Sequence, residues 1–159
     1  MIQLILLLGI SAVVGLDQLI KWLVLQRLGP SGQTEALLGL VRLRYTENTG
    51  AAFSMFDGAT TVLAVLTALM LLFCLYLLMA QKIKPKLLMY CAAAVTAGGI
   101  GNLIDRVFRG YVIDYIEPVF VRFAIFNFAD CFVTVGAGII IVYLLVDLLR
   151  EMKNRPAKS

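Results

Sequence analysis

Two long apolar runs constrain this chain more than any other feature of its sequence. Residues 60–80 and 87–104 are 21 and 18 residues long and contain no charged side chain. An α-helix needs about 20 predominantly apolar residues to span a bilayer. With 61% hydrophobic residues and a mean hydropathy of +0.92, the chain carries too much apolar surface for a soluble domain of 159 residues. The sequence therefore predicts an integral membrane protein.

Four apolar runs divide the chain, and they predict four transmembrane helices in a single domain, residues 1–159. The expected helices are residues 1–25, 60–80, 87–107 and 128–149. The first run has the position of a cleaved signal peptide. However, no Lys or Arg precedes its apolar region and no small-x-small motif closes it, so we expect it to remain as a helix.

The interval 26–59 contains the one sign of a strand. Apolar and polar side chains alternate over residues 41–46, as in a strand with one exposed face. The predicted fold is therefore an all-α membrane protein with a small β-containing region outside the membrane. On the third helix, Ala94, Gly98 and Asn102 form a stripe of small side chains that predicts close helix packing. The matching stripe on the fourth helix is expected to be Asp130, Thr134 and Gly138.

Basic residues predict how the helices are oriented. Three lysines lie in the short interval 81–86, and four Lys or Arg residues follow Leu149. Because cytoplasmic loops carry the excess of positive charge, we expect both termini in the cytoplasm and the intervals 26–59 and 108–127 on the outer side. The basic residues are not interleaved with aromatic ones, so nucleic acid is not an expected partner.

Four carboxylates are expected near the outer interface, where the helices end. They are Asp17, Asp105, Asp114 and Asp130. Ionisable groups at the ends of membrane helices are costly and by default mark a functional site. Two carboxylates in a partly dry site share one proton, and such a pair can activate water with one member while the other donates a proton. This chemistry needs neither a metal nor histidine, and the chain contains no histidine.

Structural interpretations of the same residues stay open at this point. Asn127 with Asp130 fits a helix N-cap and its acidic N3 partner. Asp105 can be a charge at a helix end, and Asp17 with Lys21 can be an ion pair that anchors the first helix. Two other functions use such residues, a small proton- or cation-coupled transporter and a non-catalytic assembly subunit. The charges gather at one interface, which disfavours the transporter.

Three motifs narrow these alternatives. The segments GGIGNLIDRVFRGYVIDYI, FNFAD and ENTGAAFS, together with Asp17 and Lys21, occur in the order and spacing of one family. In them the chain resembles the bacterial lipoprotein signal peptidases, or signal peptidase II, over essentially its whole length. The resemblance implies an aspartic endopeptidase of the bacterial cytoplasmic membrane with its active site at the outer face. It would remove signal peptides from prolipoproteins on the N-terminal side of a diacylglyceryl-modified cysteine.

The resemblance also implies roles for individual residues. The catalytic pair would be Asp114 and Asp130. Substrate binding and positioning would fall to Asn48, Gly50, Asn102, Arg106 and Asn127, and structural support to Asp17, Lys21 and Asp105. No metal or cofactor is implied, the family has an extracytoplasmic β-cradle, and the antibiotic globomycin is an expected inhibitor. The chain departs from the family at Cys131, where serine commonly follows the second aspartate, and at Glu47, where some members carry arginine.

Overall fold

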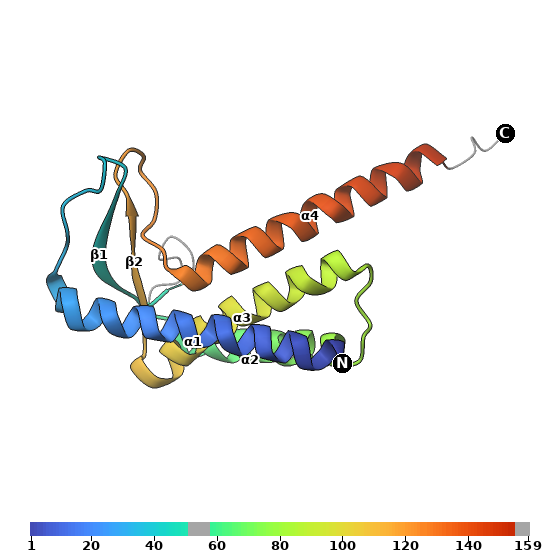
Figure 1. Ribbon diagram of the computed structural model, residues 1–159, viewed down its shortest axis with the longest axis horizontal. Coiled ribbons are helices and arrows are strands. Elements are labelled where there is room, and N and C mark those ends of the chain that lie inside the picture. Colours follow the sequence, from blue (N-terminus) through green and yellow to red (C-terminus); the bar gives the residue numbers. More distant parts are fainter. Residues whose placement is uncertain (51–57, 155–159) are drawn as a thin grey trace.

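Four helices and a two-stranded sheet make up the computed structural model, which describes residues 1–50 and 58–154 (Figure 1). The helices are α1 (Ile2–Leu28), α2 (Thr60–Met79), α3 (Lys86–Arg109) and α4 (Phe128–Asn154). All four are long and apolar enough to cross a membrane. The predicted fold class is thereby confirmed. Three of the helices continue a few residues past the apolar runs, because charged side chains at a helix end reach water.

Helix α3 is the centre of the bundle and contacts each of the other three helices. Small side chains allow this packing. A methyl group added at Gly98 would lie 2.3 Å from the carbonyl oxygen of Ala129, and one added at Gly136 would lie 2.9 Å from that of Cys91. The expected α4 stripe of residues 130, 134 and 138 therefore holds only in part, because Asp130 contacts Asn102 of α3 but Gly138 is not in the contact. Residues 129, 133 and 136 face α3, whereas Gly138 has open space around it.

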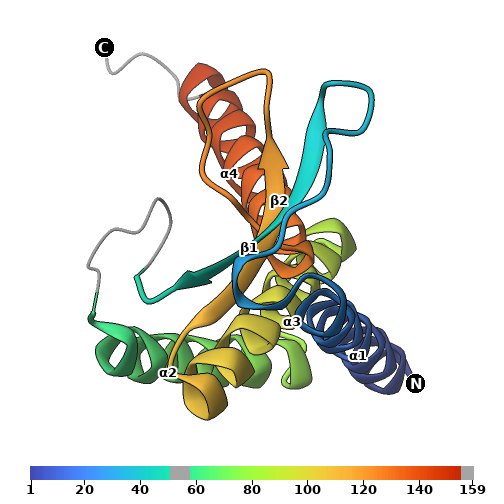
Figure 2. The ribbon, with the colours of Figure 1, turned by 90° about the vertical axis from the view of Figure 1, so that its left-hand side faces the viewer.

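The sheet pairs two segments that are far apart in the sequence. Strand β1 (Val41–Asn48) runs antiparallel to β2 (Val112–Pro118), with Asn48 opposite Val112 and Thr46 opposite Asp114. A short 3₁₀ helix, η1 (Gly29–Ser31), connects α1 to the segment before β1. The strands lie across the ends of the helices (Figures 1 and 2). Residues of the sheet and of α1 share a small core made of Val24, Tyr45, Ile113 and Tyr115.

Candidate active site

Asp114 and Asp130 line one cavity at the end of the bundle that carries the sheet. The cavity has a volume of about 310 Å³, and Asn48, Asn102 and Arg106 also line it. Asp114 comes from β2 and is buried, whereas Asp130 comes from the first turn of α4 and is half-buried. The fold therefore brings together the two carboxylates that the motifs single out, from segments on either side of a loop.

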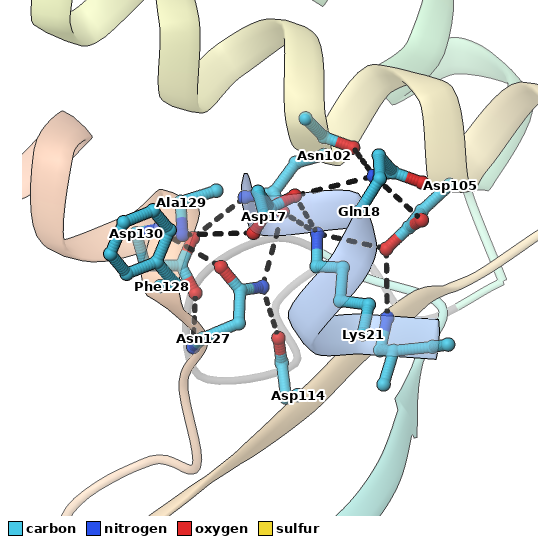
Figure 3. Close-up of polar contacts among 12 residues, drawn as sticks. Asp17, Gln18, Lys21, Asn102, Asp105, Asp114, Asn127, Phe128, Ala129 and Asp130 are labelled. Atoms are coloured by element: carbon cyan, nitrogen blue, oxygen red, sulfur yellow. Dashed lines mark hydrogen bonds and ion pairs between the residues drawn. The ribbon is translucent and has the colours of Figure 1, made fainter. Parts of the chain in front are cut away.

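Asn127 joins the two carboxylates (Figure 3). Its Nδ2 donates to Asp114 Oδ1 at 2.7 Å and to Asn102 Oδ1 at 3.1 Å, while its Oδ1 accepts a hydrogen bond from the backbone N–H of Asp130 at 3.0 Å. In return, the backbone N–H of Asn127 donates to Asp130 Oδ2 at 3.1 Å. This reciprocal pair is a capping box. The helix-cap interpretation is thus correct, and the same residues also shape the cavity.

The start of α4 is held by hydrogen bonds to two other parts of the chain, β2 and α1. The backbone N–H of Phe128 donates to the Tyr115 hydroxyl at 3.2 Å, and that of Ala129 donates to Asp17 Oδ1 at 3.1 Å. The N–H groups of a first helical turn have no partner inside the helix, so these bonds satisfy them. The helix dipole at this end also favours a negative charge on Asp130.

Lys21 lies at the centre of a buried ionic cluster next to the cavity. Its Nζ is 2.9 Å from Asp17 Oδ2, from Asp105 Oδ2 and from Asn102 Oδ1. Lys21, Asp17 and Asp105 are all almost completely buried. Asn102 connects Lys21 to Asp130, because its Nδ2 donates to Asp130 Oδ1 at 2.7 Å. The cluster that sequence predicted as structural support is therefore one network with Asp130.

A second chain of contacts runs from Asp114 to α3. Asn48 Nδ2 donates to Asp114 Oδ2 at 2.9 Å, and Asn48 Oδ1 accepts the backbone N–H of Gly50 at 3.0 Å. Arg106 Nη2 then donates to the Gly50 carbonyl oxygen at 2.9 Å. Arg106 Nε is buried and has no hydrogen-bond partner in the part of the chain that the structure describes. Asn48, Arg106 and Asp114 line the cavity.

The environment of Asp114 favours its protonated form. Burial raises the pKa of this carboxyl to about 7, and the negative charge of Asp130 acts in the same direction. Hydrogen bonds from Asn48 and Asn127 act in the opposite direction but do not cancel the effect of burial.

The charges around the cavity also favour one shared proton. The local carboxylates outnumber the local cations by one. They are Asp17, Asp105, Asp114 and Asp130 on one side, and Lys21, Arg106 and Arg109 on the other. A single proton on the pair Asp114 and Asp130 brings this set to neutrality, which is the favourable state in a region of low dielectric.

Three residues of the network were not predicted. Gln18 Nε2 donates to the Gly101 carbonyl oxygen at 3.1 Å and contacts Asp105, and Arg109 pairs with Asp105 at 2.8 Å. Tyr115 supports the start of α4 through its hydroxyl. Gln18 could have been predicted from the sequence, since it is a polar residue within an apolar run. Arg109 lies one helical turn after Asp105, a spacing that also predicts pairing.

Cys131 does not face the cavity that Asp114 and Asp130 line. Its Sγ contacts the backbone oxygen of Asn127 at 3.5 Å, and its side chain lines an apolar groove with Tyr90, Ala94 and Phe132. In the part of the chain that the structure describes, its hydrogen bond is therefore to the backbone of Asn127 and not to the carboxyl group of Asp114 or Asp130. Being next to Asp130 in sequence places the two side chains about 100° apart around the helix.

The peptidase activity that the motifs imply is expected to stay within roughly a factor of two when Cys131 is replaced by serine, a change of about 0.4 kcal/mol in the barrier. A serine hydroxyl can donate to the same Asn127 carbonyl oxygen. Cleavage rates of the two purified proteins, before and after treatment with a bulky thiol reagent, measure the effect. Loss of activity in Cys131→Ser would indicate a catalytic thiol.

Comparison with known proteins relates the whole chain to one family. The family model described as "Signal peptidase (SPase) II" matches residues 9–146. A lipoprotein signal peptidase of Enterococcus faecalis is 38% identical over 91% of this chain and 91% of its own length. One of Brucella ovis is 42% identical over 86% of each chain. A solved structure of a bacterial membrane enzyme, 26% identical, superimposes with a TM-score of 0.79 over 97% of this chain and 93% of that one.

Proposed function

Because the chain belongs to the signal peptidase II family, whose members remove signal peptides from prolipoproteins, we propose that it does so as an aspartic endopeptidase with Asp114 and Asp130 as its catalytic pair. The observation that carries the proposal is the placement of both carboxylates in one cavity, joined through the Asn127 side chain. The chain is a multi-pass bacterial membrane protein with four membrane-spanning helices.

In the proposed mechanism the two carboxyl groups have different tasks. Asp130, which accepts hydrogen bonds from the Asn102 side chain and from the Asn127 backbone, acts as the base. It removes a proton from water as the water oxygen attacks the scissile carbonyl carbon. Asp114, whose buried site favours the protonated form, donates its proton to the carbonyl oxygen. The tetrahedral gem-diol then collapses: the C–N bond breaks as Asp130 gives the proton taken from water to the leaving amine nitrogen, and Asp114 takes a proton back from a gem-diol hydroxyl as the new carboxyl group forms.

The surrounding polar residues are proposed to hold the pair and the substrate. Asn48, Asn102 and Asn127 donate to the two carboxylates and so fix the directions of their lone pairs. Arg106 holds the Gly50 backbone and has a buried Nε–H that can donate to a carbonyl oxygen of the substrate main chain. The buried cluster of Asp17, Lys21 and Asp105 is proposed to hold Asn102, and through it Asp130, in place.

The substrate is proposed to be a prolipoprotein that carries a diacylglyceryl-modified cysteine, cut on the N-terminal side of that cysteine. Asn102, Arg106 and Asp130 come from the ends of α3 and α4, and Asn48 and Asp114 come from the two strands. The sheet lies at one end of the bundle (Figure 1). A site at that level lets the lipid chains of the substrate stay in the bilayer while the peptide bond reaches the carboxylates. Globomycin is the proposed inhibitor of the same cavity.

The site is proposed to face the outer side of the membrane, with both termini in the cytoplasm. We expect a cysteine introduced at Lys84 to react with an impermeant thiol reagent only after cells are opened, because the lysine-rich loop 81–86 faces the cytoplasm. A cysteine introduced at the exposed Glu35, which precedes β1 in the interval 26–59, should react with the same reagent in intact cells. Reaction of the residue 84 cysteine in intact cells would contradict the orientation.

The cleavage rate is expected to fall as pH rises above about 7, the pKa of Asp114, because the pair then loses its shared proton. The measurement is kcat/KM against pH for the reconstituted enzyme, and its apparent pKa values belong to the pair. A rate that stays level far above neutral pH would contradict the assignment of the acid.

A loss of folding stability at high pH would also lower the cleavage rate, so thermal unfolding is measured over the same pH range. The folded state holds the Asp114 proton more tightly than the unfolded chain, for which the ordinary pKa is 3.8. This contribution to stability is therefore fully present below that value and is lost as pH rises to about 7. Thermal unfolding at each pH separates lost chemistry from lost fold.

One experiment tests the proposed function as a whole. The purified protein in lipid vesicles is incubated with a prolipoprotein segment that carries the diacylglyceryl cysteine, and the products are identified by mass spectrometry. We expect a product that begins with the modified cysteine, with a metal chelator present or absent. Failure to cut, or equal cutting of the same segment without its lipid, would contradict the proposal.

A further inference from the structure

We propose that the end of the sheet farthest from the catalytic pair is a lipid-binding tip that inserts into the outer leaflet of the membrane beside the helices. This sheet tip consists of residues 36–40, before β1, and residues 119–123, after β2. The partner is the phospholipid surface, with its acyl chains against apolar side chains and its phosphates against arginine. The proposal concerns a surface outside the catalytic cavity and goes beyond the proposed peptidase function.

The sheet tip exposes large apolar side chains. Leu37 is 73% exposed, Leu38 87% and Phe120 68%, and Leu40 and Val121 are also exposed. The two parts of the tip form one surface, since the backbone N–H of Val119 donates to the Leu40 carbonyl oxygen at 2.9 Å. These side chains do not belong to the membrane-spanning helices. A contiguous apolar patch of this kind marks an interaction site.

The backbone of the tip holds a leucine outward at a conformational cost. Leu38 has φ +52° and Gly39 has φ +69°, so two consecutive residues adopt the left-handed region. Asn, Asp and Gly are the residues that normally occupy such turns, whereas a bulky side chain there is an outlier. The sequence nevertheless places Leu-Leu-Gly-Leu at this turn. An apolar partner outside the chain accounts for a leucine at its most exposed position.

The direction of the strands brings the tip to the membrane surface. Strand β2 begins three residues after α3 ends, so the base of the sheet lies at the level of the helix ends. From there the strands run across the direction of α1 instead of continuing along it (Figure 1). Seven strand residues extend about 23 Å. The tip therefore lies to the side of the bundle, as the end-on view also shows (Figure 2), where bilayer surrounds the helices.

Arginine side chains border the apolar surface. Arg42 and Arg44 contact Glu117 across the sheet, at 3.0 and 3.5 Å, and Arg122 is exposed in the tip itself. Arg42, Arg122 and Phe120 line a hollow of about 740 Å³ on this surface. The three arginines outnumber the two nearby carboxylates, Glu117 and the exposed Glu35, so the net charge of this surface is +1. Apolar side chains next to exposed cations are typical of a surface that binds lipid headgroups and penetrates roughly 5–10 Å.

Tryptophan fluorescence with brominated lipid tests the insertion. The chain has one tryptophan, Trp22, which is half exposed on α1 and can be replaced by phenylalanine. In that background, Leu38→Trp and Phe120→Trp each place a single reporter in the tip. The control is Lys84→Trp, an exposed position in the polar loop between α2 and α3. Each protein is reconstituted into vesicles of phosphatidylcholine with or without bromine on the acyl chains.

The expected result is that the two tip tryptophans lose roughly half or more of their emission in brominated vesicles, as reporters within the acyl boundary do. The Lys84→Trp reporter should keep its emission there and be quenched by acrylamide in water. Tip reporters that behave like the Lys84→Trp control would overturn the proposal. So would tip reporters that respond only when a prolipoprotein is added, since the tip would then bind the substrate. The readout needs no peptide cleavage, so its failure leaves the peptidase proposal untouched.

Discussion

Replacing Lys21 by methionine is expected to lower the free energy of unfolding by about 3–5 kcal/mol, the usual cost of removing one partner from a buried ion pair. Lys21 Nζ is 2.9 Å from both Asp17 and Asp105, and all three side chains are almost completely buried. Methionine fills a similar volume but carries no charge. Asp17 and Asp105 would then face each other without a cation between them.

Two variants show whether the lost stability is electrostatic. Adding Asp17→Asn and Asp105→Asn to Lys21→Met should recover much of it, because no buried carboxylate is then left without its cation. Arg109, the other partner of Asp105, is 25% exposed and can reach water. Lys82→Met, at an exposed position, should unfold at the wild-type temperature. The measurement is thermal unfolding in detergent, followed by the reaction of the buried Cys91 with a thiol-sensitive dye. A Lys21→Met protein as stable as wild type would show that the cluster does not hold the fold.

Asp114→Asn and Asp130→Asn are each expected to reduce kcat by at least about a thousandfold, within the range by which positioned acids and bases accelerate reactions. An asparagine side chain has nearly the shape of aspartate but can neither take a proton from water nor supply one. The expected losses are in kcat, since neither change removes the walls of the cavity.

The structure explains why these variants should fold. In Asp130→Asn, the side-chain oxygen can still accept the backbone N–H of Asn127, so the start of α4 keeps its cap. Asp147→Asn is the matched control, because this carboxylate lies near the other end of the same helix. It should retain wild-type activity. Equal amounts of inserted protein and equal unfolding temperatures are needed before rates are compared.

The helices could be predicted from sequence because charge-free runs of membrane length permit little else. Asp17, Lys21, Asp105 and Asp130 were likewise conspicuous, since ionisable residues are costly at the ends of such runs. Their convergence followed from topology, because four helices that alternate in direction bring those ends to one side. The contacts then found between Lys21 and both of its aspartates agree with that reasoning.

The rotation of α4 about its axis could not be predicted. Much of that helix is apolar on every side and faces lipid, so its pattern does not show which side packs on α3. The structure turns Ala129 and Val133 toward Gly98, and this rotation also moves Cys131 away from the cavity. Strand β2 was missed from the residues alone for a related reason. It is buried along most of its length and shows no alternation.

Asn127 shows that a structural and a functional interpretation of one motif need not exclude each other. The spacing of Asn127 and Asp130 predicted a helix cap, and the capping box is present. The remaining donor of the same side chain then contacts Asp114 at 2.7 Å. A cap uses one side-chain oxygen, so the Nδ2 group is free to join the second carboxylate to the first.

The most direct test of the aspartate pair compares Asp114→Asn, Asp130→Asn and the double variant in one cleavage assay. Each is reconstituted at matched amounts in lipid vesicles with the same lipidated prolipoprotein segment, and product is measured over long incubations. If the two carboxylates act as one unit, all three proteins should show the same residual rate, because removing the second member costs nothing further. Robust turnover by either single variant would contradict the pair as the catalytic centre.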